Sequence, residues 1–326
     1  MVILSKPGIE QLSVIRAANK MGPSIIPLID LSKPDAKTQI VKACEDFGFF
    51  KLVNHGVPTE FISRLEKEAV KFFSLPLTDK QMVGPPNPYG YGNKKIGNNG
   101  DVGWIEYLLI NINHHNLPSF FSDNPFEFRC AVRDYVREVK RMACEVVELM
   151  ADGLRIEERE VFSKLLKDEK SDSLFRVNHY PPCPSTDGNN MLGFGEHTDP
   201  QIISVLRSNN TCGLEIFVKD ANWVSVPSDQ HSFFFNVGDS LQVMTNGRFK
   251  SVRHRVITNK LKSRVSMVYF GGPPMSEKIG PLPSLTGGDN QTSLYKEFTW
   301  FEYKNSAYKS RLADNRLVRF EKIAAS

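Results

Sequence analysis

The sequence has few cysteines, no long apolar run and no large excess of one charge. Its five cysteines are scattered, odd in number and without C-x-x-C spacing, so they indicate neither a disulfide framework nor a cysteine-ligated zinc site. No apolar stretch is long enough to cross a bilayer, and the first residues lack the basic segment and apolar core of a signal peptide. We therefore expect a cytoplasmic protein in a reducing compartment.

Charge is nearly balanced, with 41 Lys and Arg residues against 37 Asp and Glu residues and a formal net charge of +4. Such a small excess does not indicate a nucleic-acid or membrane partner. The densest basic run, residues 250–264, does not indicate nucleic-acid binding either, because alternate residues of a strand lie on opposite faces and its charges would be divided between them. With 326 residues, 40% of them hydrophobic, the chain is long enough to bury a core.

Apolar periodicity predicts helices mainly in the first half of the chain. Residues 37–47, a segment opened by Pro58, and residues 126–150 carry apolar side chains at three- and four-residue spacing. Residues 85–103, which are rich in Gly, Pro and Asn, predict a long loop of the kind that is often functional. A last helix is expected at about residues 299–312.

The sequence pattern changes near residue 174. From there on, short stretches in which apolar and polar residues alternate are separated by Gly, Pro, Asn and Asp. These stretches predict strands at residues 175–180, 192–197, 202–206, 214–218, 223–226, 233–237, 241–244, 252–257 and 265–270. Regular short strands of this kind favour a sandwich or barrel. We expect an α+β fold with a mainly β core, in which a helix-rich region (residues 1–170) packs against a double-stranded β-helix, or jelly roll (residues 171–326).

The strongest chemical signal is the string at residues 195–201. If it is a strand, His197 and Asp199 project from one face. His254 lies further on, in another stretch with strand-like alternation. Two histidines and one carboxylate on one face leave coordination positions open, which is the arrangement of non-haem Fe(II) oxygenases. The three residues are therefore candidate metal ligands and catalytic residues.

A carboxylate-binding pair follows this group. Arg264 and Ser266 share one face of the next predicted strand and offer a guanidinium fork and a hydroxyl. An isolated H-x-D triplet occurs by chance in many chains. The triplet followed by His254 and then by this pair is far more specific.

The predicted loop and the stretch after it carry aromatic residues and a cation. Lys95, Trp104 and Tyr107, with Tyr89 and Tyr91, would suit an apolar ligand that carries a carboxylate. Their alternative role, as turn and packing residues, stays open.

Several strings resemble the plant branch of the 2-oxoglutarate and Fe(II)-dependent dioxygenases, across most of the chain. They are residues 26–30, 48–50, 53–56 and 270–273. Longer strings are similar to the gibberellin 2-oxidase group of that family (gibberellin 2β-dioxygenases), and above all to forms that act on C19 gibberellins. They are residues 90–97, 103–109, 178–181, 193–201 and 246–251. Lys95 stands where the resemblance leads us to expect arginine. Lysine keeps the positive charge but cannot form the two parallel hydrogen bonds that arginine makes to a carboxylate.

The resemblance implies a set of cofactor-binding residues. His197, Asp199 and His254 would bind Fe(II). Arg264 and Ser266 would hold the distal carboxylate of 2-oxoglutarate, and Tyr180 would add a hydroxyl to it. Asn178, on the same strand face as Tyr180, would be a further cofactor-binding residue.

The resemblance also implies a reaction. With 2-oxoglutarate and O₂ as cosubstrates, and ascorbate as a reductant in vitro, the protein would hydroxylate C19 gibberellins at the 2β position and inactivate the hormone. Lys95 would face the gibberellin carboxylate, and Trp104 and Tyr107 would form part of an apolar wall. We expect a small-molecule partner, no nucleic acid or membrane, and a monomer or weak homo-oligomer.

Two other functions remain open at this point. One is the same oxygenase chemistry on another plant metabolite, such as a flavonoid or a different gibberellin carbon. The other is a non-catalytic jelly roll that binds a ligand and keeps a metal for structure. Open coordination positions argue against the second, because structural metal sites are usually closed.

Overall fold

The computed structural model of the chain describes residues 14–15, 26–87, 89–96, 99–112, 125–183, 190–218, 222–286 and 293–322. Within these ranges, no helix combines the length and the apolar character needed to span a bilayer. Strands from both sides of residue 170 lie in the same large sheet.

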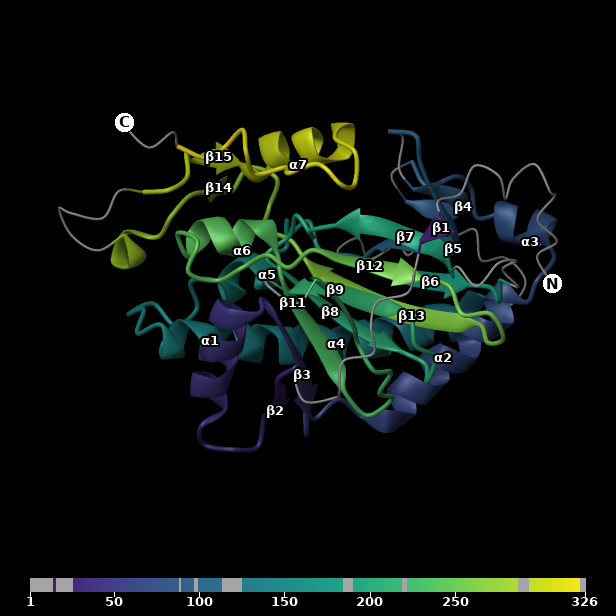
Figure 1. Cartoon of the computed structure of the whole chain (residues 1–326). Helices are drawn as coiled ribbons and strands as arrows, with labels where there is room; N and C mark the ends of the chain where they lie inside the picture. Colours follow the sequence, from purple (N-terminus) through teal and green to yellow (C-terminus); the bar gives the residue numbers. More distant parts are fainter. Residues whose placement is uncertain are drawn as a thin grey trace.

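The long helices lie along one side of the β core (Figure 1). They are α1 (Ala36–Asp46), α2 (Thr59–Phe73) and α4 (Pro125–Gly153), and they confirm the helices predicted from periodicity. Shorter helices follow two of them, α3 (Leu77–Gln81) and α5 (Ser163–Lys167). The apolar stripe of α4 is buried between α1, α2 and the sheet, because a helix of this length is stable only when its apolar face is covered.

The β core consists of two sheets. The eight-stranded sheet has the order β2 (Leu28–Asp30), β3 (Phe49–Val53), β11 (Phe233–Val237), β8 (Ile203–Ser208), β13 (Arg264–Gly271), β6 (Leu174–Tyr180), β5 (Asp101–Asn111), β4 (Gly90–Ile96). The five-stranded sheet has the order β1 (Val14–Ile15), β7 (Asn190–His197), β12 (His254–Ile257), β9 (Leu214–Val218), β10 (Asn222–Ser225). These two sheets confirm the predicted jelly roll.

Alternation along the central strands divides the core into two clusters. On β8, Val205 belongs to the cluster under the helices, and Leu206 belongs to the cluster between the two sheets. Phe235 and Phe234 divide in the same way on β11. The larger sheet is therefore covered on both faces, and its second face forms the floor of the space between the sheets.

The C-terminal segment packs at one end of this core. It contains a two-stranded sheet of β14 (Lys278–Ile279) and β15 (Phe298–Thr299), a 3₁₀ turn at Pro283–Leu285, and helix α7 (Trp300–Lys309). Thr299 and Glu302 form a capping box that begins α7. The indole N–H of Trp300 donates to Asp172 at 2.8 Å, which ties the helix back to the start of the jelly roll. The expected last helix is thus present, and it ends a few residues earlier than predicted.

The strand predicted at residues 241–244 is wrong, because these residues lie in helix α6 (Asp239–Met244). Leu241, Val243 and Met244 form a short apolar run, and such a run does not distinguish a buried strand from a buried helix. Gly238 and Asp239 begin the helix. A Cβ at Gly238 would lie 1.9 Å from the carbonyl oxygen of Gln201, so only glycine allows this close approach.

The long loop predicted at residues 85–103 is also wrong from residue 90 onward, where β4 and β5 form an antiparallel pair. The glycines in this stretch suggested a loop, but in the structure they allow neighbouring strands to pack closely. A Cβ at Gly92 would lie 2.2 Å from the Tyr107 ring, and one at Gly103 would lie 2.2 Å from the carbonyl oxygen of Gly193. Glycine is therefore required at both positions by neighbouring strands.

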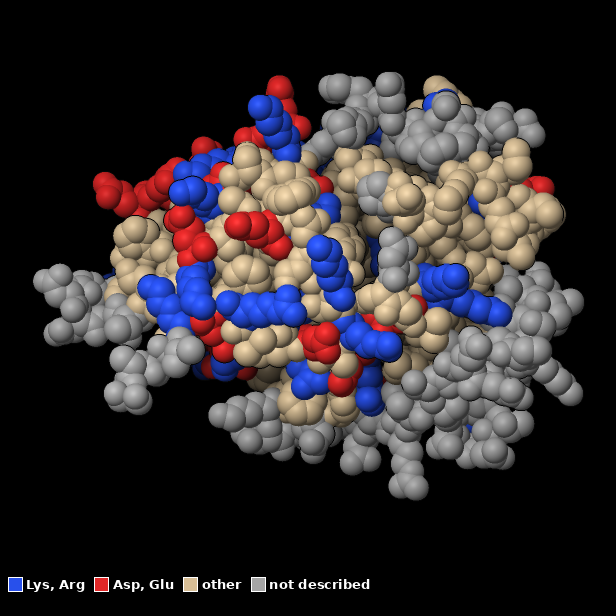
Figure 2. All heavy atoms as spheres, turned by 90° about the horizontal axis from the view of Figure 1, so that it is seen from above, with Lys and Arg blue, Asp and Glu red and all other residues tan. Residues whose placement is uncertain are grey.

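Charged side chains of both signs are interspersed on the face shown in Figure 2. Within the basic run at residues 250–264, Arg253 pairs with Glu196 and Arg255 pairs with Glu215, each at 2.7 Å. Arg264 is buried in the core. The run therefore does not form one exposed basic surface.

Candidate active site

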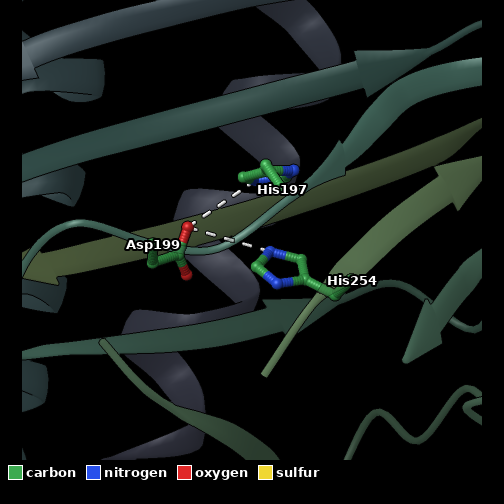
Figure 3. Close-up of side chains that lie close together, drawn as sticks. All are labelled: His197, Asp199 and His254. Carbon is green, nitrogen blue, oxygen red and sulfur yellow. Dashed lines mark ion pairs between the residues drawn. The ribbon is translucent and has the colours of Figure 1, made fainter. Parts of the chain in front are cut away.

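His197, Asp199 and His254 lie together at the edge of the space between the sheets (Figure 3). His197 ends β7, Asp199 follows just beyond that strand, and His254 opens β12 directly opposite His197. Oδ1 of Asp199 lies 3.6 Å from Nε2 of His197 and 3.8 Å from Nε2 of His254. Asn236 donates to the other oxygen of Asp199 at 3.3 Å. The described residues contain no other such group of three potential metal ligands.

Backbone carbonyls orient both imidazoles. Nδ1 of His197 lies 2.8 Å from the carbonyl oxygen of Gly195, and Nδ1 of His254 lies 3.2 Å from that of Val252. Because a carbonyl only accepts hydrogen bonds, we assign the proton to Nδ1 in both rings, which leaves the Nε2 lone pairs directed at Asp199. Burial, helped by the nearby His254, lowers the pKa of His197 well below its usual value. The ring is therefore neutral and able to bind a metal ion at pH 7.

Asp239, in the first turn of α6, fixes the segment that carries Asp199. Its backbone N–H donates to the carbonyl oxygen of Asp199 at 2.7 Å. Its carboxylate accepts hydrogen bonds from the hydroxyls of Thr198 at 3.1 Å and Tyr303 at 2.6 Å. Arg316 donates to the carbonyl oxygen of Thr198 at 3.1 Å. Sequence periodicity did not reveal this support, because it placed a strand where α6 lies; the glycine and aspartate that begin α6 were the available signal.

A second group lies across β13 and β6, where Arg264 faces Tyr180 and Ser266 faces Asn178 in the strand register. The Asn178 amide donates to the Ser266 hydroxyl at 3.3 Å. Arg264 is only 2% exposed, and its Nε and Nη1 atoms have no hydrogen-bond partner among the described residues. Buried guanidinium N–H groups without an acceptor are unfavourable. This end of the site therefore fits a carboxylate.

One cavity of about 60 Å³ joins the two groups. Its lining includes the three potential metal ligands, Arg264 and Ser266, and a second guanidinium from Arg176. The apolar part of the lining consists of Phe194, Leu206, Leu214, Val256, Val268 and Phe270. Potential metal ligands, a guanidinium that can bind an anion, and apolar side chains therefore line one cavity.

The residues expected to bind substrate are divided by the structure. Lys95 is exposed and lines a separate hollow of about 590 Å³. The Trp104 indole donates to the carbonyl oxygen of Pro181 at 3.1 Å, and Trp104 is absent from the described lining of the cavity. Tyr107 lines the same hollow as Lys95, but its ring stacks on Arg176, which lines the cavity. Arg176 lies on the same face of β6 as Asn178 and Tyr180. The sequence could therefore have identified Arg176, because it stands two residues before Asn178 in the same alternating pattern.

Comparisons with known proteins agree with this geometry. Residues 171–273 match the family model of the 2OG-Fe(II) oxygenase superfamily, and residues 26–125 match that of the non-haem dioxygenase in morphine synthesis N-terminal region. Gibberellin 2-beta-dioxygenase 1 of Pisum sativum is 62% identical over 331 residues, covering 100% of both chains. The gibberellin 2-beta-dioxygenase of Phaseolus coccineus is 58% identical, again over 100% of both. This chain belongs to the gibberellin 2-beta-dioxygenases.

Solved structures place this gibberellin 2-beta-dioxygenase family member in the same fold. A crystal structure of JOX2 in complex with 2OG, Fe and JA has a TM-score of 0.83 and 28% sequence identity, covering 95% of this chain and 91% of that one. The rice dioxygenase for auxin oxidation has a TM-score of 0.77 at 24% identity, covering 91% and 100%. The chain is thus a dioxygenase of the 2OG-Fe(II) superfamily with the fold expected from its sequence.

Proposed function

We propose that this enzyme uses Fe(II), 2-oxoglutarate and O₂ to hydroxylate C19 gibberellins at the 2β position, which inactivates the hormone. The observation that carries the proposal is the shared cavity, which is lined by three potential metal ligands and by Arg264, whose Nε and Nη1 have no hydrogen-bond partner among the described residues. Full-length relatives that are named gibberellin 2-beta-dioxygenases support the choice of substrate.

His197, Asp199 and His254 are the proposed iron ligands. Their hydrogen bonds to backbone carbonyls and to Asn236 set the direction of each donor atom before a metal arrives. Two histidines and one carboxylate would leave positions open for the cosubstrate and for O₂. When bound, the iron and 2-oxoglutarate supply the oxidising power, as 2-oxoglutarate is converted to succinate and CO₂ and one oxygen atom enters the substrate.

Arg264 and Ser266 are proposed to hold the far carboxylate of 2-oxoglutarate, with Tyr180 and Asn178 beside them. The planar guanidinium can form two parallel hydrogen bonds to a carboxylate. The side chain is 2% exposed, and two of its nitrogens lack a partner among the described residues, so a carboxylate bound there would satisfy buried donors. The hydroxyl of Ser266 is already oriented by the Asn178 amide.

The apolar lining suits the proposed substrate. A gibberellin is a rigid, mostly apolar polycycle that carries a carboxylate, and Phe194, Val268 and Phe270 line the cavity beside the proposed iron site. Removing water from such a space strengthens the polar contacts inside it and protects the reactive oxidant.

We further propose that the enzyme works in a reducing compartment such as the cytoplasm, as a monomer or weak homo-oligomer. All five cysteines are reduced, and four of them are buried; Cys212 is exposed with its sulfur 3.4 Å from the Ser228 hydroxyl. Structural disulfides are rare in reducing compartments.

A product assay tests the function. Purified enzyme with Fe(II), ascorbate, O₂ and 2-oxoglutarate is given a panel of C19 and C20 gibberellins, and succinate and hydroxylated products are measured by mass spectrometry. We expect a 2β-hydroxylated C19 product with an equal amount of succinate. Succinate without a gibberellin product would keep the oxygenase chemistry and reject the substrate. Absence of succinate from iron-loaded protein would favour a ligand-binding role instead.

A further inference from the structure

Arg176 places a second guanidinium in the cavity, at a distance from the carboxylate site of Arg264. It lies on β6 two residues before Asn178 and four before Tyr180, so the three side chains project from one face of the strand. Nε and Nη2 of Arg176 are buried and have no hydrogen-bond partner among the described residues. Asp199 is the one acidic side chain in the described lining, and it faces the two histidines. The charge of Arg176 is therefore not matched within this cavity.

Aromatic rings hold the Arg176 guanidinium in place. Its central carbon lies 3.8 Å from the ring centroid of Tyr107 and 5.0 Å from that of Phe194. The Tyr107 hydroxyl donates to the carbonyl oxygen of Lys95 at 3.1 Å, which fixes the ring itself. Stacking covers the face of a guanidinium and leaves the N–H groups along its edge able to bind a planar anion.

The strand positions of Arg176 and Arg264 are too far apart for the two side chains to share one carboxylate. In the register of β6 and β13, Arg264 faces Tyr180 while Arg176 faces Val268. Four residues of strand separate the two positions, which is about 13 Å at roughly 3.3 Å per residue. Their strand positions therefore favour contact with two different carboxylates in the same cavity.

Formal charge also indicates a second anion. A divalent iron ion, the Asp199 carboxylate and the guanidiniums of Arg176 and Arg264 leave a surplus of three positive charges when both histidines are neutral. The two carboxylates of 2-oxoglutarate match two of these charges. Unmatched charge in a buried site is strongly unfavourable, so a substrate with one carboxylate would complete the balance.

The neighbours of Arg176 suit the rest of such a substrate. Val268 pairs with Arg176 on one side and with Leu206 on the other in the strand register, and the Phe194 ring lies against the Arg176 guanidinium. Lys95, in contrast, is exposed and lines the separate hollow. Arg176 therefore combines buried guanidinium donors with apolar neighbours, whereas the Lys95 cation is exposed.

We propose that Arg176 binds the carboxylate of the gibberellin substrate and that Tyr107 positions the guanidinium for this contact. The inference rests on the proposed gibberellin hydroxylation. It makes Arg176 a specificity-determining residue, which separates gibberellin acids from neutral ring systems of the same shape.

The test compares a free C19 gibberellin acid with its methyl ester, in the wild-type enzyme and in Arg176→Gln. A hydrogen-bonded charge of this kind corresponds to roughly a 10- to 100-fold difference in binding. The wild type should therefore favour the acid over the ester by about that factor in kcat/KM. Arg176→Gln should lose most of the preference through a raised KM for the acid, while its KM for 2-oxoglutarate stays at the wild-type value.

Two further variants keep the result decisive. Arg176→Lys retains the charge but not the planar edge, so it should show a preference between those of the wild type and Arg176→Gln. Lys95→Gln should keep the preference for the acid. Formation of succinate from 2-oxoglutarate without gibberellin shows that each variant is folded and loaded with iron.

The outcomes distinguish this inference from the function on which it rests. If Arg176→Gln loses activity on acid and ester in equal proportion, Arg176 has a structural role and the inference is overturned. If Lys95→Gln loses the preference and Arg176→Gln keeps it, the carboxylate lies at Lys95. If the wild type forms succinate but hydroxylates no gibberellin, the proposed function fails and this inference fails with it.

Discussion

The ammonium of Lys80 lies 2.7 Å from Oε2 of Glu106, and neither side chain is more than 2% exposed. The same carboxylate accepts a hydrogen bond from the Tyr91 hydroxyl at 2.5 Å and lies 2.6 Å from Nδ1 of His179. His179 in turn contacts Ser263, the residue before Arg264. This buried network therefore connects α3 and the β4–β5 pair to the strands that carry the proposed 2-oxoglutarate site.

Replacing Glu106 with Gln should destabilise the fold by about 3–5 kcal/mol at pH 7, because the buried Lys80 ammonium would lose its counter-charge. Denaturation by urea measures this loss. The double variant Lys80→Met/Glu106→Gln should recover part of it, because no uncompensated charge remains. Glu127→Gln is a matched control, since Glu127 pairs with Arg64 on the surface and should matter by under about 1 kcal/mol.

The effect of Glu106→Gln should also depend on pH. Burial raises the pKa of Glu106, but hydrogen bonds from His179, Lys80 and Tyr91 more than offset this, so the pKa lies below the usual 4.5. Because the folded pKa is depressed, the stabilisation is complete above pH 4.5 and is lost as the pH falls through the folded value. The gap between wild type and variant should narrow below pH 4.5. A gap that stays constant down to pH 3 would contradict this account.

Replacing His254 with Ala should remove iron binding and activity together. His254 supplies one of the three donor atoms, and outer partners of metal ligands alone usually affect affinity by about 10- to 100-fold. Loss of the ligand itself should exceed that range. Titration with Fe(II) under anaerobic conditions measures the affinity, and His231→Ala serves as the control because His231 is exposed and outside the group. Wild-type affinity in the His254 variant would exclude it as a ligand.

Replacing Arg264 with Lys should raise the KM for 2-oxoglutarate by roughly tenfold, because an ammonium cannot form the two parallel hydrogen bonds of a guanidinium. The KM for gibberellin should change little. A kinetic assay that varies each substrate separately checks the contrast. Equal increases in both constants would indicate a general disturbance of the cavity instead of a lost carboxylate contact.

The proposed iron site could be located from sequence because its pattern is local. His197 and Asp199 are two residues apart, and period-two geometry alone places them on one face of a strand. The strand alternation around residues 214–218 and 233–237 also predicted β9 and β11 with the bounds that the structure has. Short-range periodicity contains enough information for features of this kind.

The substrate side of the cavity could not be located in this way, because it depends on pairing between distant strands. Tyr107 reaches Arg176 only because β5 pairs with β6, and the register of that pair cannot be read from either strand alone. Lys95 and Trp104 lie in the same stretch of sequence as Tyr107. The hairpin nevertheless directs Lys95 to the surface and Trp104 toward Pro181.

Replacing Tyr303 with Phe should weaken iron binding by roughly tenfold. This is the lower end of the usual effect of residues that orient a metal ligand without binding the metal. The Tyr303 hydroxyl donates to Asp239 at 2.6 Å, and the Asp239 backbone N–H donates to the carbonyl oxygen of Asp199. The variant should also lose about 1–3 kcal/mol of stability, because a buried carboxylate loses one donor. Fe(II) titration and urea denaturation measure the two effects.

The stability loss in Tyr303→Phe should be larger at pH 7 than in acid. Burial raises the pKa of Asp239, and the Tyr303 hydroxyl is one of the donors that opposes this rise. Without that donor the folded pKa rises further, so the penalty applies only while Asp239 is ionised and disappears once it is protonated. Tyr308→Phe, on the same helix and 49% exposed, is the matched control and should keep wild-type iron affinity. If Tyr303→Phe also keeps that affinity while losing stability, α7 supports the fold without positioning Asp199.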